Sequence, residues 1–123
     1  MASENEQVVS KFIAAFGRRN LDEIMSFFDD DAVYHNIPMD PARGKEAIKG
    51  VINTFLPMAK SVEFRVLNTT AAGNVVMNER VDIFDMGGKR IELPVAGVFE
   101  IRKGKIAAWR DYFDLASWTK QMS

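Results

Sequence analysis

The sequence predicts an α+β domain in which helices come first and a long, curved β-sheet follows. Up to about residue 56, apolar residues recur at helical spacing, whereas from Ser61 onward they alternate with polar residues at a period of two. The alternating segments are separated by short glycine-containing stretches, Gly73-Asn74, Gly87-Gly88 and Lys103–Lys105, which are typical of hairpin turns.

Two helices are expected at the start of the chain. Ser3 with Glu6 forms a capping box, and apolar residues at helical spacing carry the first helix to about Arg19. Asn20 with Glu23 repeats the capping pattern before a short second helix. The residues that line this helix are Leu21, Ile24, Met25, Phe27 and Phe28.

The next segments are expected to be a loop, a strand and a third helix. Residues 29–31, all aspartates, are interpreted as a solvated loop at a helix end, since they lack the spacing and central glycine of a calcium loop. Residues 32–38 predict a brief strand stopped by Pro38. Gly44 then opens a helix whose apolar residues run to Leu56, with a break expected near Pro57.

Four strands are predicted to follow, at residues 61–71, 75–86, 89–102 and 106–118. Pro94 and Gly97 indicate a bulge or bend within the third of them. Long strands with a bend curl into a cone, and the inner face of a cone can form a pocket. The fold class is therefore a cone-shaped, strongly curved mixed or antiparallel sheet with N-terminal helices packed against it.

Composition narrows the chemistry. The chain of 123 residues, expected to form a single domain, carries a formal net charge of −1, which argues against nucleic acid or an anionic membrane as a partner. It has no cysteine and one histidine, so it has no disulfide, no thiol nucleophile and no multi-histidine metal site. With no secretion signal or apolar span visible, a cytoplasmic location is expected.

The strand at "NERVDIF", residues 78–84, is ambiguous. Arg80 and Asp82 share one face of it, while Val81 and Ile83 share the other. The two charged residues are either an exposed ion pair or a polar pair that points into the cone. An inward pair would meet the apolar face of the next strand, which is made of Ile91, Leu93, Val95, Gly97 and Phe99.

Other polar residues occur in the same pattern. Asp111 shares a face with Trp109 and Phe113, and Tyr34 shares a face with Asn36. His35, on the other face of its strand, is interpreted as a hydrogen-bonded edge residue rather than a catalytic base.

The segments "VYHNIPMDPARG", "NERVDIFDM" and "GVFEIRKGKIAAWRDYFDLASW" resemble the limonene-1,2-epoxide hydrolase family, over nearly the whole chain. That family has the cone-shaped fold of nuclear transport factor 2 and ketosteroid isomerase. Its tyrosine–x–asparagine matches Tyr34 and Asn36, its arginine–x–aspartate matches Arg80 and Asp82, and its tryptophan–arginine–aspartate supplies Asp111. The resemblance therefore implies that Arg80 and Asp82 point inward.

The resemblance also implies a mechanism, in which water is added to an epoxide in one step without metal or cofactor. Asp82 is then the general acid, Asp111 the general base, Arg80 the group that holds both carboxyls, and Tyr34 and Asn36 the residues that position water. A homodimer formed through the outer surface of the sheet is expected on the same ground. The apolar residues expected to contact a small cyclic or terpene-like epoxide are Leu93, Val95, Phe99, Phe113, Phe55 and Leu56.

Two other functions fit the same fold. A polyketide cyclase or ketosteroid isomerase-like enzyme would use Asp82 or Asp111 to move a proton next to a carbonyl, with no need for Tyr34 and Asn36. A non-catalytic ligand-binding module would bind an apolar molecule without turnover.

Overall fold

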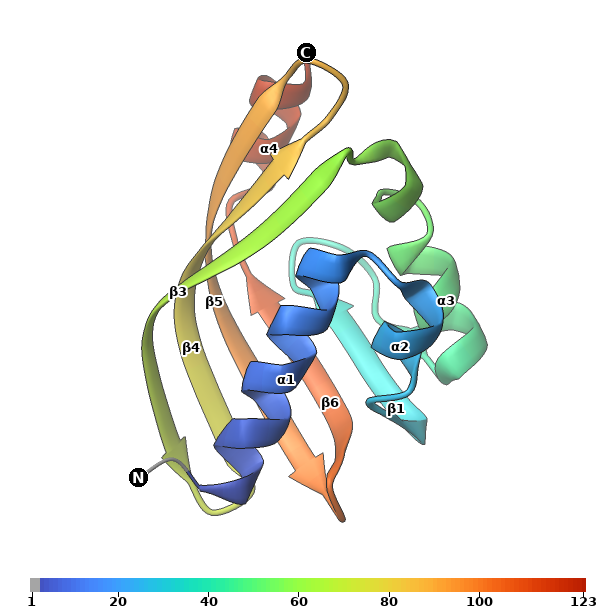
Figure 1. Cartoon of the computed structure of the whole chain (residues 1–123), viewed down its shortest axis with the longest axis vertical. Coiled ribbons are helices and arrows are strands. Elements are labelled where there is room, and N and C mark those ends of the chain that lie inside the picture. The colour runs from blue at the N-terminus through green and yellow to red at the C-terminus, as the bar shows by residue number, and fades with distance from the viewer. Residues whose placement is uncertain (1–2) are drawn as a thin grey trace.

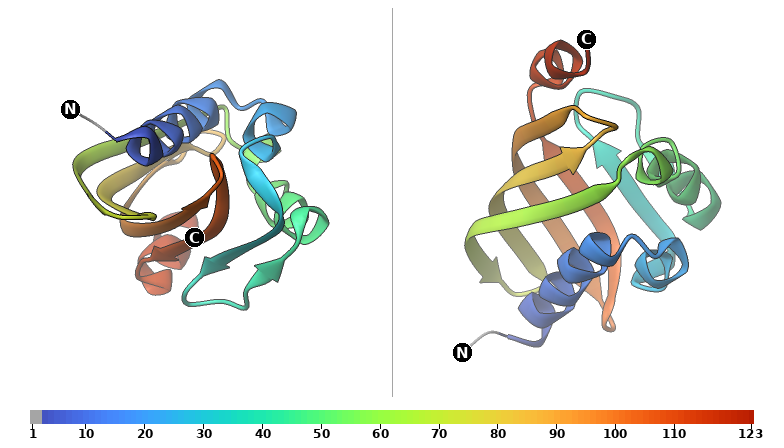
Figure 2. Two further views of the ribbon diagram at one scale, coloured as in Figure 1. Left: turned by 90° about the horizontal axis from the view of Figure 1, so that it is seen from below. Right: turned by 45° about the horizontal axis from the view of Figure 1, so that its top comes forward.

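The structure is a computed structural model that describes residues 3–123. A six-stranded sheet, in the order β2-β1-β6-β5-β4-β3, wraps around one side of the helices (Figures 1 and 2). The elements are α1 (Glu4–Arg18), α2 (Leu21–Met25), β1 (Phe28–Asn36), β2 (Ala42–Arg43), α3 (Lys45–Ile52), the 3-10 turn η1 (Leu56–Met58), β3 (Ser61–Ala72), β4 (Val75–Asp85), β5 (Arg90–Arg102), β6 (Lys105–Tyr112) and α4 (Leu115–Met122).

The first helix forms as the sequence predicts. The Ser3 side chain accepts a hydrogen bond from the Glu6 amide, and the Glu6 carboxylate accepts one from the Ser3 amide, which completes the capping box. Phe12 and Phe16 on its inner face are fully buried. The Phe12 ring meets the Trp109 ring edge-on at 5.0 Å, and this contact fixes α1 against the sheet.

The sheet combines a meander with one parallel pair. β3, β4, β5 and β6 pair antiparallel in sequence order, as expected, but β1 pairs in parallel with β6. The parallel pair sets Tyr34 beside Trp109 and Asn36 beside Asp111. β1 and β6 are far apart in the sequence, since β2, α3 and β3 to β5 lie between them. The local sequence pattern therefore gives no sign that they pair.

Three local expectations are wrong around the short helices. Phe28 does not belong to the second helix but starts β1, because its buried ring packs against Phe12 at 5.4 Å. Residues 29–31 continue this strand rather than forming a loop, and Asp29 pairs with Arg102 on β5 at 2.7 Å. The third helix ends at Ile52, well before Leu56, and Pro57 lies in the following 3-10 turn instead.

Two further corrections concern the C-terminal half. β5 pairs with β4 without a register shift, and its pairing with β6 shifts between Glu100 and Ile101, so the irregularity in this strand lies beyond Pro94 and Gly97. The strand expected over residues 106–118 ends at Tyr112, because Asp114 accepts a hydrogen bond from the Ala116 amide and thereby caps a new helix, α4.

Candidate active site

The inner face of the sheet carries a buried polar cluster. Arg80 and Asp82 on β4, Asp111 on β6 and Asn78 on β4 are each no more than 4% exposed. Strand parity explains why they meet: Asp82 pairs with Leu93 and Arg80 with Val95 on β5, and Asp111 pairs with Gly97 of the same strand. Arg80 and Asp82 therefore point into the cone, as the resemblance implies.

Arg80 joins the two carboxylates. Its Nε donates to Asp82 Oδ1 at 2.7 Å and its Nη2 to Asp82 Oδ2 at 3.2 Å, which is a bidentate ion pair. The same Nη2 donates to Asp111 Oδ2 at 2.5 Å. The guanidinium also lies 4.9 Å from the centre of the Phe64 ring, which covers one face of it.

Gly97 makes room for this arrangement. A Cβ atom at residue 97 would overlap Arg80 Nη1 and would lie 2.8 Å from Asn78 Oδ1 and 3.0 Å from Asp111 Oδ1. The glycine in β5 is therefore a position of close approach between backbone and guanidinium.

Asp111 is held from a second direction. The indole Nε1 of Trp109 donates to Asp111 Oδ1 at 2.6 Å. The Trp109 ring is fully buried and stacks on Tyr34, with ring centres 4.0 Å apart and an angle of 11° between the planes. One tryptophan thus fixes both the carboxylate and the tyrosine that lies beside it.

Burial determines the protonation of the two aspartates. Loss of hydration raises the pKa of Asp82 to about 7, against the opposing effect of the Arg80 charge, and the Asp111 charge adds to the rise. Burial likewise raises the pKa of Asp111, although Arg80 and the Trp109 N–H both oppose it. Two adjacent carboxyls that share one guanidinium retain a proton near neutral pH.

Tyr34 and Arg80, which lie beside the two aspartates, each keep a single protonation state. Burial raises the pKa of the Tyr34 phenol, and the Asp111 charge raises it further, so this residue stays a neutral phenol. Burial acts to lower the pKa of Arg80, but the charges of Asp111 and Asp82 outweigh it, so its pKa rises and the guanidinium stays charged. The site therefore contains one permanent cation and two carboxyls whose pKa values are raised by burial.

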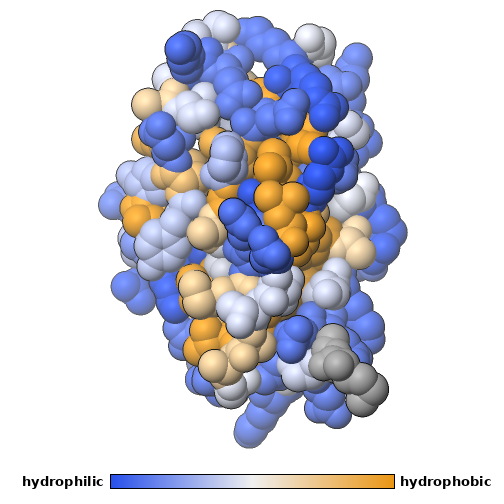
Figure 3. Space-filling view, turned by 90° about the vertical axis from the view of Figure 1, so that its left-hand side faces the viewer, coloured by the Kyte–Doolittle hydropathy of each residue, from blue (hydrophilic) through white to orange (hydrophobic). Residues whose placement is uncertain are grey.

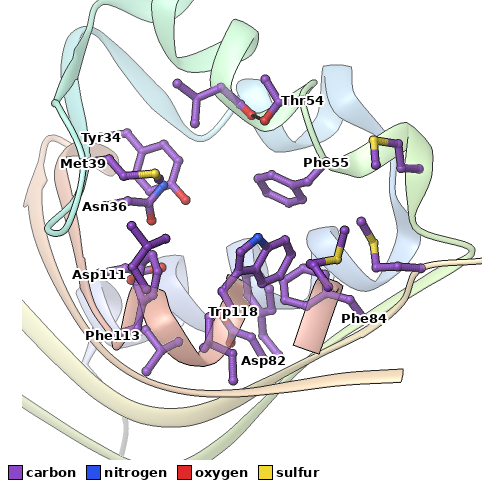
Figure 4. Close-up of a pocket in the computed structure, with 18 residues that line it drawn as sticks. Tyr34, Asn36, Met39, Thr54, Phe55, Asp82, Phe84, Asp111, Phe113 and Trp118 are labelled. Carbon is purple, nitrogen blue, oxygen red and sulfur yellow. Dashed lines mark hydrogen bonds between the residues drawn. The ribbon is translucent and has the colours of Figure 1, made fainter. Parts of the chain in front are cut away.

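A cavity of about 330 Å³ opens over this cluster (Figure 4). Tyr34, Asn36, Asp82 and Asp111 line it, and Tyr34, Asn36 and Asp111 lie together at one end. The rest of the wall is almost wholly apolar. It comprises Met39, Val51, Thr54, Phe55, Met58, Phe64, Phe84, Met86, Leu93, Val95, Phe113, Leu115, Trp118 and Met122.

The wall includes four of the six residues expected to contact substrate, namely Leu93, Val95, Phe55 and Phe113. The other two are corrections. Phe99 shares the inward parity but lies behind the cluster, where its ring stacks on Trp109 at 5.7 Å in the closed core. Leu56 is 4% exposed and packs into the same core, because the helix that was to carry it ends four residues earlier.

Sequence reasoning missed several residues of the site. Trp118, Leu115 and Met122 reach the cavity from α4, and their helical spacing within residues 115–122 was the signal available for them. Parity places Asn78 on the same strand face as Arg80, but it does not predict the hydrogen bond between the Asn78 amide oxygen and the guanidinium. His35 fits its interpretation, since its Nε2 lies 2.8 Å from the Met39 carbonyl oxygen.

The fold and this buried cluster define a cone-shaped α+β protein of the nuclear transport factor 2-like class. Residues 3–123 match the description "Limonene-1,2-epoxide hydrolase catalytic domain". The chain belongs to the limonene-1,2-epoxide hydrolase family, as the sequence resemblance implies.

A sequence comparison and a structure comparison both find an epoxide hydrolase of Mycobacterium tuberculosis that is similar along most of the chain. Epoxide hydrolase EphG of strain ATCC 25618 / H37Rv is 31% identical over 107 residues, which are 87% of this chain and 71% of the relative. The solved structure of an M. tuberculosis limonene-epoxide-hydrolase-like epoxide hydrolase superposes with a TM-score of 0.81 at 31% identity, covering 96% of this chain and 88% of that one.

A third comparison shows the fold alone. A putative polyketide cyclase from Xanthomonas campestris pv. campestris has a TM-score of 0.86 at 22% identity, and covers 98% of this chain and 97% of its own. No helix within residues 3–123 is long and apolar enough to cross a membrane.

Proposed function

We propose that this protein hydrolyses small apolar epoxides to vicinal diols in a single step of general acid–base catalysis. The observation that carries the proposal is the pair of carboxyls, Asp82 and Asp111, which share Arg80 and both face one apolar cavity. Family membership supports the reaction class. The pair and one water supply every proton the reaction needs, so the proposed reaction needs neither a metal nor an organic cofactor.

Asp82 is the proposed general acid. An epoxide oxygen leaves as an alkoxide unless it is protonated while the ring opens, and a carboxyl that keeps its proton near pH 7 can donate it. As the C–O bond breaks, the proton of Asp82 passes to that oxygen, which becomes the first hydroxyl of the diol. Arg80 stabilises the carboxylate that remains, through its two hydrogen bonds to Asp82.

Asp111 is the proposed general base. Water attacks the ring carbon as the C–O bond breaks, and its proton passes to Asp111 to leave the second hydroxyl of the diol. Tyr34 and Asn36 lie at the same end of the cavity as Asp111 and supply polar groups that orient the water. Because Asp111 accepts from both Arg80 and Trp109, its carboxylate is ionised at less cost than burial alone would allow.

Turnover leaves the proton on the other carboxyl. After reaction Asp111 holds the proton and Asp82 is ionised, so the total charge of the two carboxyls with Arg80 is unchanged. Arg80 hydrogen-bonds to both and stabilises either form, and exchange with solvent through the open cavity then restores the starting state.

The proposed substrate is a cyclic or terpene-like epoxide. The apolar wall offers no charged or strongly polar partner apart from the catalytic end, so a hydrocarbon skeleton is the complementary ligand. A cavity of about 330 Å³ suits one small ring system rather than an extended chain.

The test is diol formation from a panel of epoxides that includes limonene and cyclohexene oxides, analysed on a chiral column. Wild-type protein should form diol from at least one of them, while Asp82→Asn and Asp111→Asn should remain folded and form none. Proton exchange next to the carbonyl of an enolisable ketone, without diol, would favour a cyclase or isomerase. Binding of epoxides without any turnover would favour a ligand-binding module.

We also propose that two copies associate through the outer face of the sheet. Two apolar cross-strand pairs lie side by side there, Met77 with Val98 and Ala96 with Tyr112, and the same rows also carry Arg110 beside Val98 and Glu79 beside Ala96. Met77 and Tyr112 are 44% and 46% exposed. Figure 3 shows apolar side chains gathered among charged ones on the side of β3 and β4. Val98→Glu should convert a dimer to a monomer in sedimentation, and a monomeric wild-type protein would contradict the proposal.

A further inference from the structure

Asn78 contacts the guanidinium of Arg80 from outside the cavity that Asp82 and Asp111 line. Its side-chain Oδ1 accepts a hydrogen bond from Arg80 Nη1 at 2.9 Å, and the residue is 4% exposed. It does not line the cavity above Asp82 and Asp111, so it contacts neither substrate nor water in the proposed reaction. Asn78 completes the set of side chains that fix the guanidinium: Asp82, Asp111 and Asn78 hold three different nitrogens of Arg80.

Only one orientation of the Asn78 amide is compatible with this contact. A guanidinium carries donors and no acceptor, so the amide oxygen must face Arg80 and the amide nitrogen must point away. Asn78 Nδ2 is buried and has no hydrogen-bond partner among the described residues. Asn78 also lines a shallow groove between α1 and β3, together with Ser10 and Thr69. A buried amide donor without a protein partner destabilises the fold. The side chain nevertheless takes this orientation, so we infer that its hydrogen bond to Arg80 contributes more than the unpaired donor costs.

The hydrogen-bond acceptor at residue 78 is a neutral amide oxygen. It therefore does not change the number of protons that the Asp82–Arg80–Asp111 cluster holds. Asp82, Asp111, Arg80 and one proton sum to zero charge, and a third carboxylate would change that balance. Asn78 Oδ1 and Asp111 Oδ1 both lie within about 3 Å of the same point, the site of a Cβ on residue 97, so a charge at residue 78 would act on Asp111 directly.

We infer that Asn78 is a positioning residue: it fixes Arg80 from behind with a neutral acceptor, and so keeps the Asp82–Arg80–Asp111 cluster at a single transferable proton. The inference rests on the proposed function for its catalytic consequence. Its electrostatic consequence stands independently, because it concerns the titration of the carboxyls and requires no turnover.

The first experiment follows the carboxyl carbons of the protein by NMR, with carbon-13-labelled aspartate, as pH is varied. Asn78→Asp keeps the shape and the acceptor oxygen but adds a charge. The apparent pKa values of the buried carboxyls should rise by about one unit or more relative to wild type. Asn74→Asp, which adds the same charge at the exposed β3–β4 turn, should leave them in place. Cluster titrations in Asn78→Asp that superimpose on those of wild type would overturn the inference.

The second experiment measures steady-state kinetics. Asn78→Leu removes the acceptor without adding charge, so Arg80 loses one of its restraints. The kcat for an epoxide should fall about tenfold, while KM stays within about twofold because Asn78 lies outside the cavity. An unchanged kcat in folded Asn78→Leu would overturn the inference.

Asn78→Asp should move both limbs of the kcat profile to higher pH. If wild type makes no diol but the titrations still shift, the proposed function fails and the role of Asn78 stands.

Discussion

The absence of a side chain at Gly97 is what allows the guanidinium of Arg80 to lie flat between the two aspartates. A Cβ at residue 97 would overlap Arg80 Nη1 and crowd Asp111 Oδ1. The backbone of β5 is paired on both sides, with β4 and β6, so it cannot retreat to relieve the contact. The geometry of the Asp82–Arg80–Asp111 cluster therefore depends on a residue that carries no functional group.

Gly97→Ala should disrupt the cluster more than it disrupts the fold. The added methyl group must displace the Arg80 side chain, which separates Asp82 from Asp111, and the free energy of unfolding should fall by about 1–3 kcal/mol. Diol formation should fall at least about a hundredfold. Gly50→Ala is the matched control, because a Cβ at that helical position meets open space, and it should keep wild-type activity and be at least as stable as wild type, since alanine favours a helix. Full activity in Gly97→Ala would contradict this view of the site.

Trp109→Phe should change the pH dependence of catalysis. The Trp109 N–H lowers the pKa of Asp111, so removing it while keeping an aromatic ring raises that pKa. A general base with a raised pKa becomes ionised at higher pH, and the acidic limb of the kcat profile should therefore move to higher pH. Trp118→Phe, which removes an indole from the cavity wall without touching a carboxylate, should not move that limb. Identical profiles for wild type and Trp109→Phe would contradict the assignment.

The raised pKa of Asp82 has a consequence for stability. Burial raises it in the folded protein to about 7, above its usual value of 3.8, so the folded state binds more protons than the unfolded state between these values. Stability contributed by this group is therefore complete below about pH 4 and declines as the pH rises to about 7. Asp82→Asn imitates the protonated form and removes this decline.

Denaturant unfolding of wild type and Asp82→Asn across that pH range measures the effect. The stability of the variant relative to wild type should increase with pH, by on the order of 1–3 kcal/mol in total. Asp114→Asn, at an exposed helix cap, should show no such increase. A difference between Asp82→Asn and wild type that stays constant with pH would mean that Asp82 titrates at an ordinary value.

Trp118→Ala should alter substrate selection rather than chemistry. Trp118 lies on the cavity wall with its ring 5.3 Å from that of Phe84, so its loss enlarges the cavity without touching Asp82 or Asp111. The KM for a small cyclic epoxide should rise about tenfold, and bulkier epoxides should become better substrates. Lys120→Ala, an exposed change on the same helix, is the control. A fall in kcat with unchanged KM would place Trp118 in the chemical step instead.

Strand parity predicted most of the polar site. Period-two alternation put Arg80 with Asp82, and Asp111 with Trp109, on common faces, but alternation cannot tell the inner face of a sheet from the outer one. The family resemblance supplied that choice. Parity also explains the error at Phe99. It predicts that a side chain points inward, but not whether that side chain lines the cavity or packs in the core beneath α1, as Phe99 does.

The other errors arise from contacts that are distant in sequence. Residues 29–31 look like a loop because three successive aspartates are unusual in a strand, yet β1 runs through them between Phe28 and Val33, which both pair with β6 on either side of a register shift. The helix at residues 115–122 has no buried residue, so its apolar pattern is weak and does not separate it from the strand before it. The cavity nevertheless takes three of its lining residues from that helix.

In the proposed reaction Asp111 activates water, and neither aspartate attacks the epoxide. A single turnover with protein in excess, in water labelled with oxygen-18, tests it directly, followed by mass spectrometry of the diol and of the peptides that contain Asp82 and Asp111. Direct attack by water should put one labelled oxygen in the diol and none in either peptide. Label in an aspartate, with unlabelled diol, would show a covalent ester intermediate and contradict the mechanism.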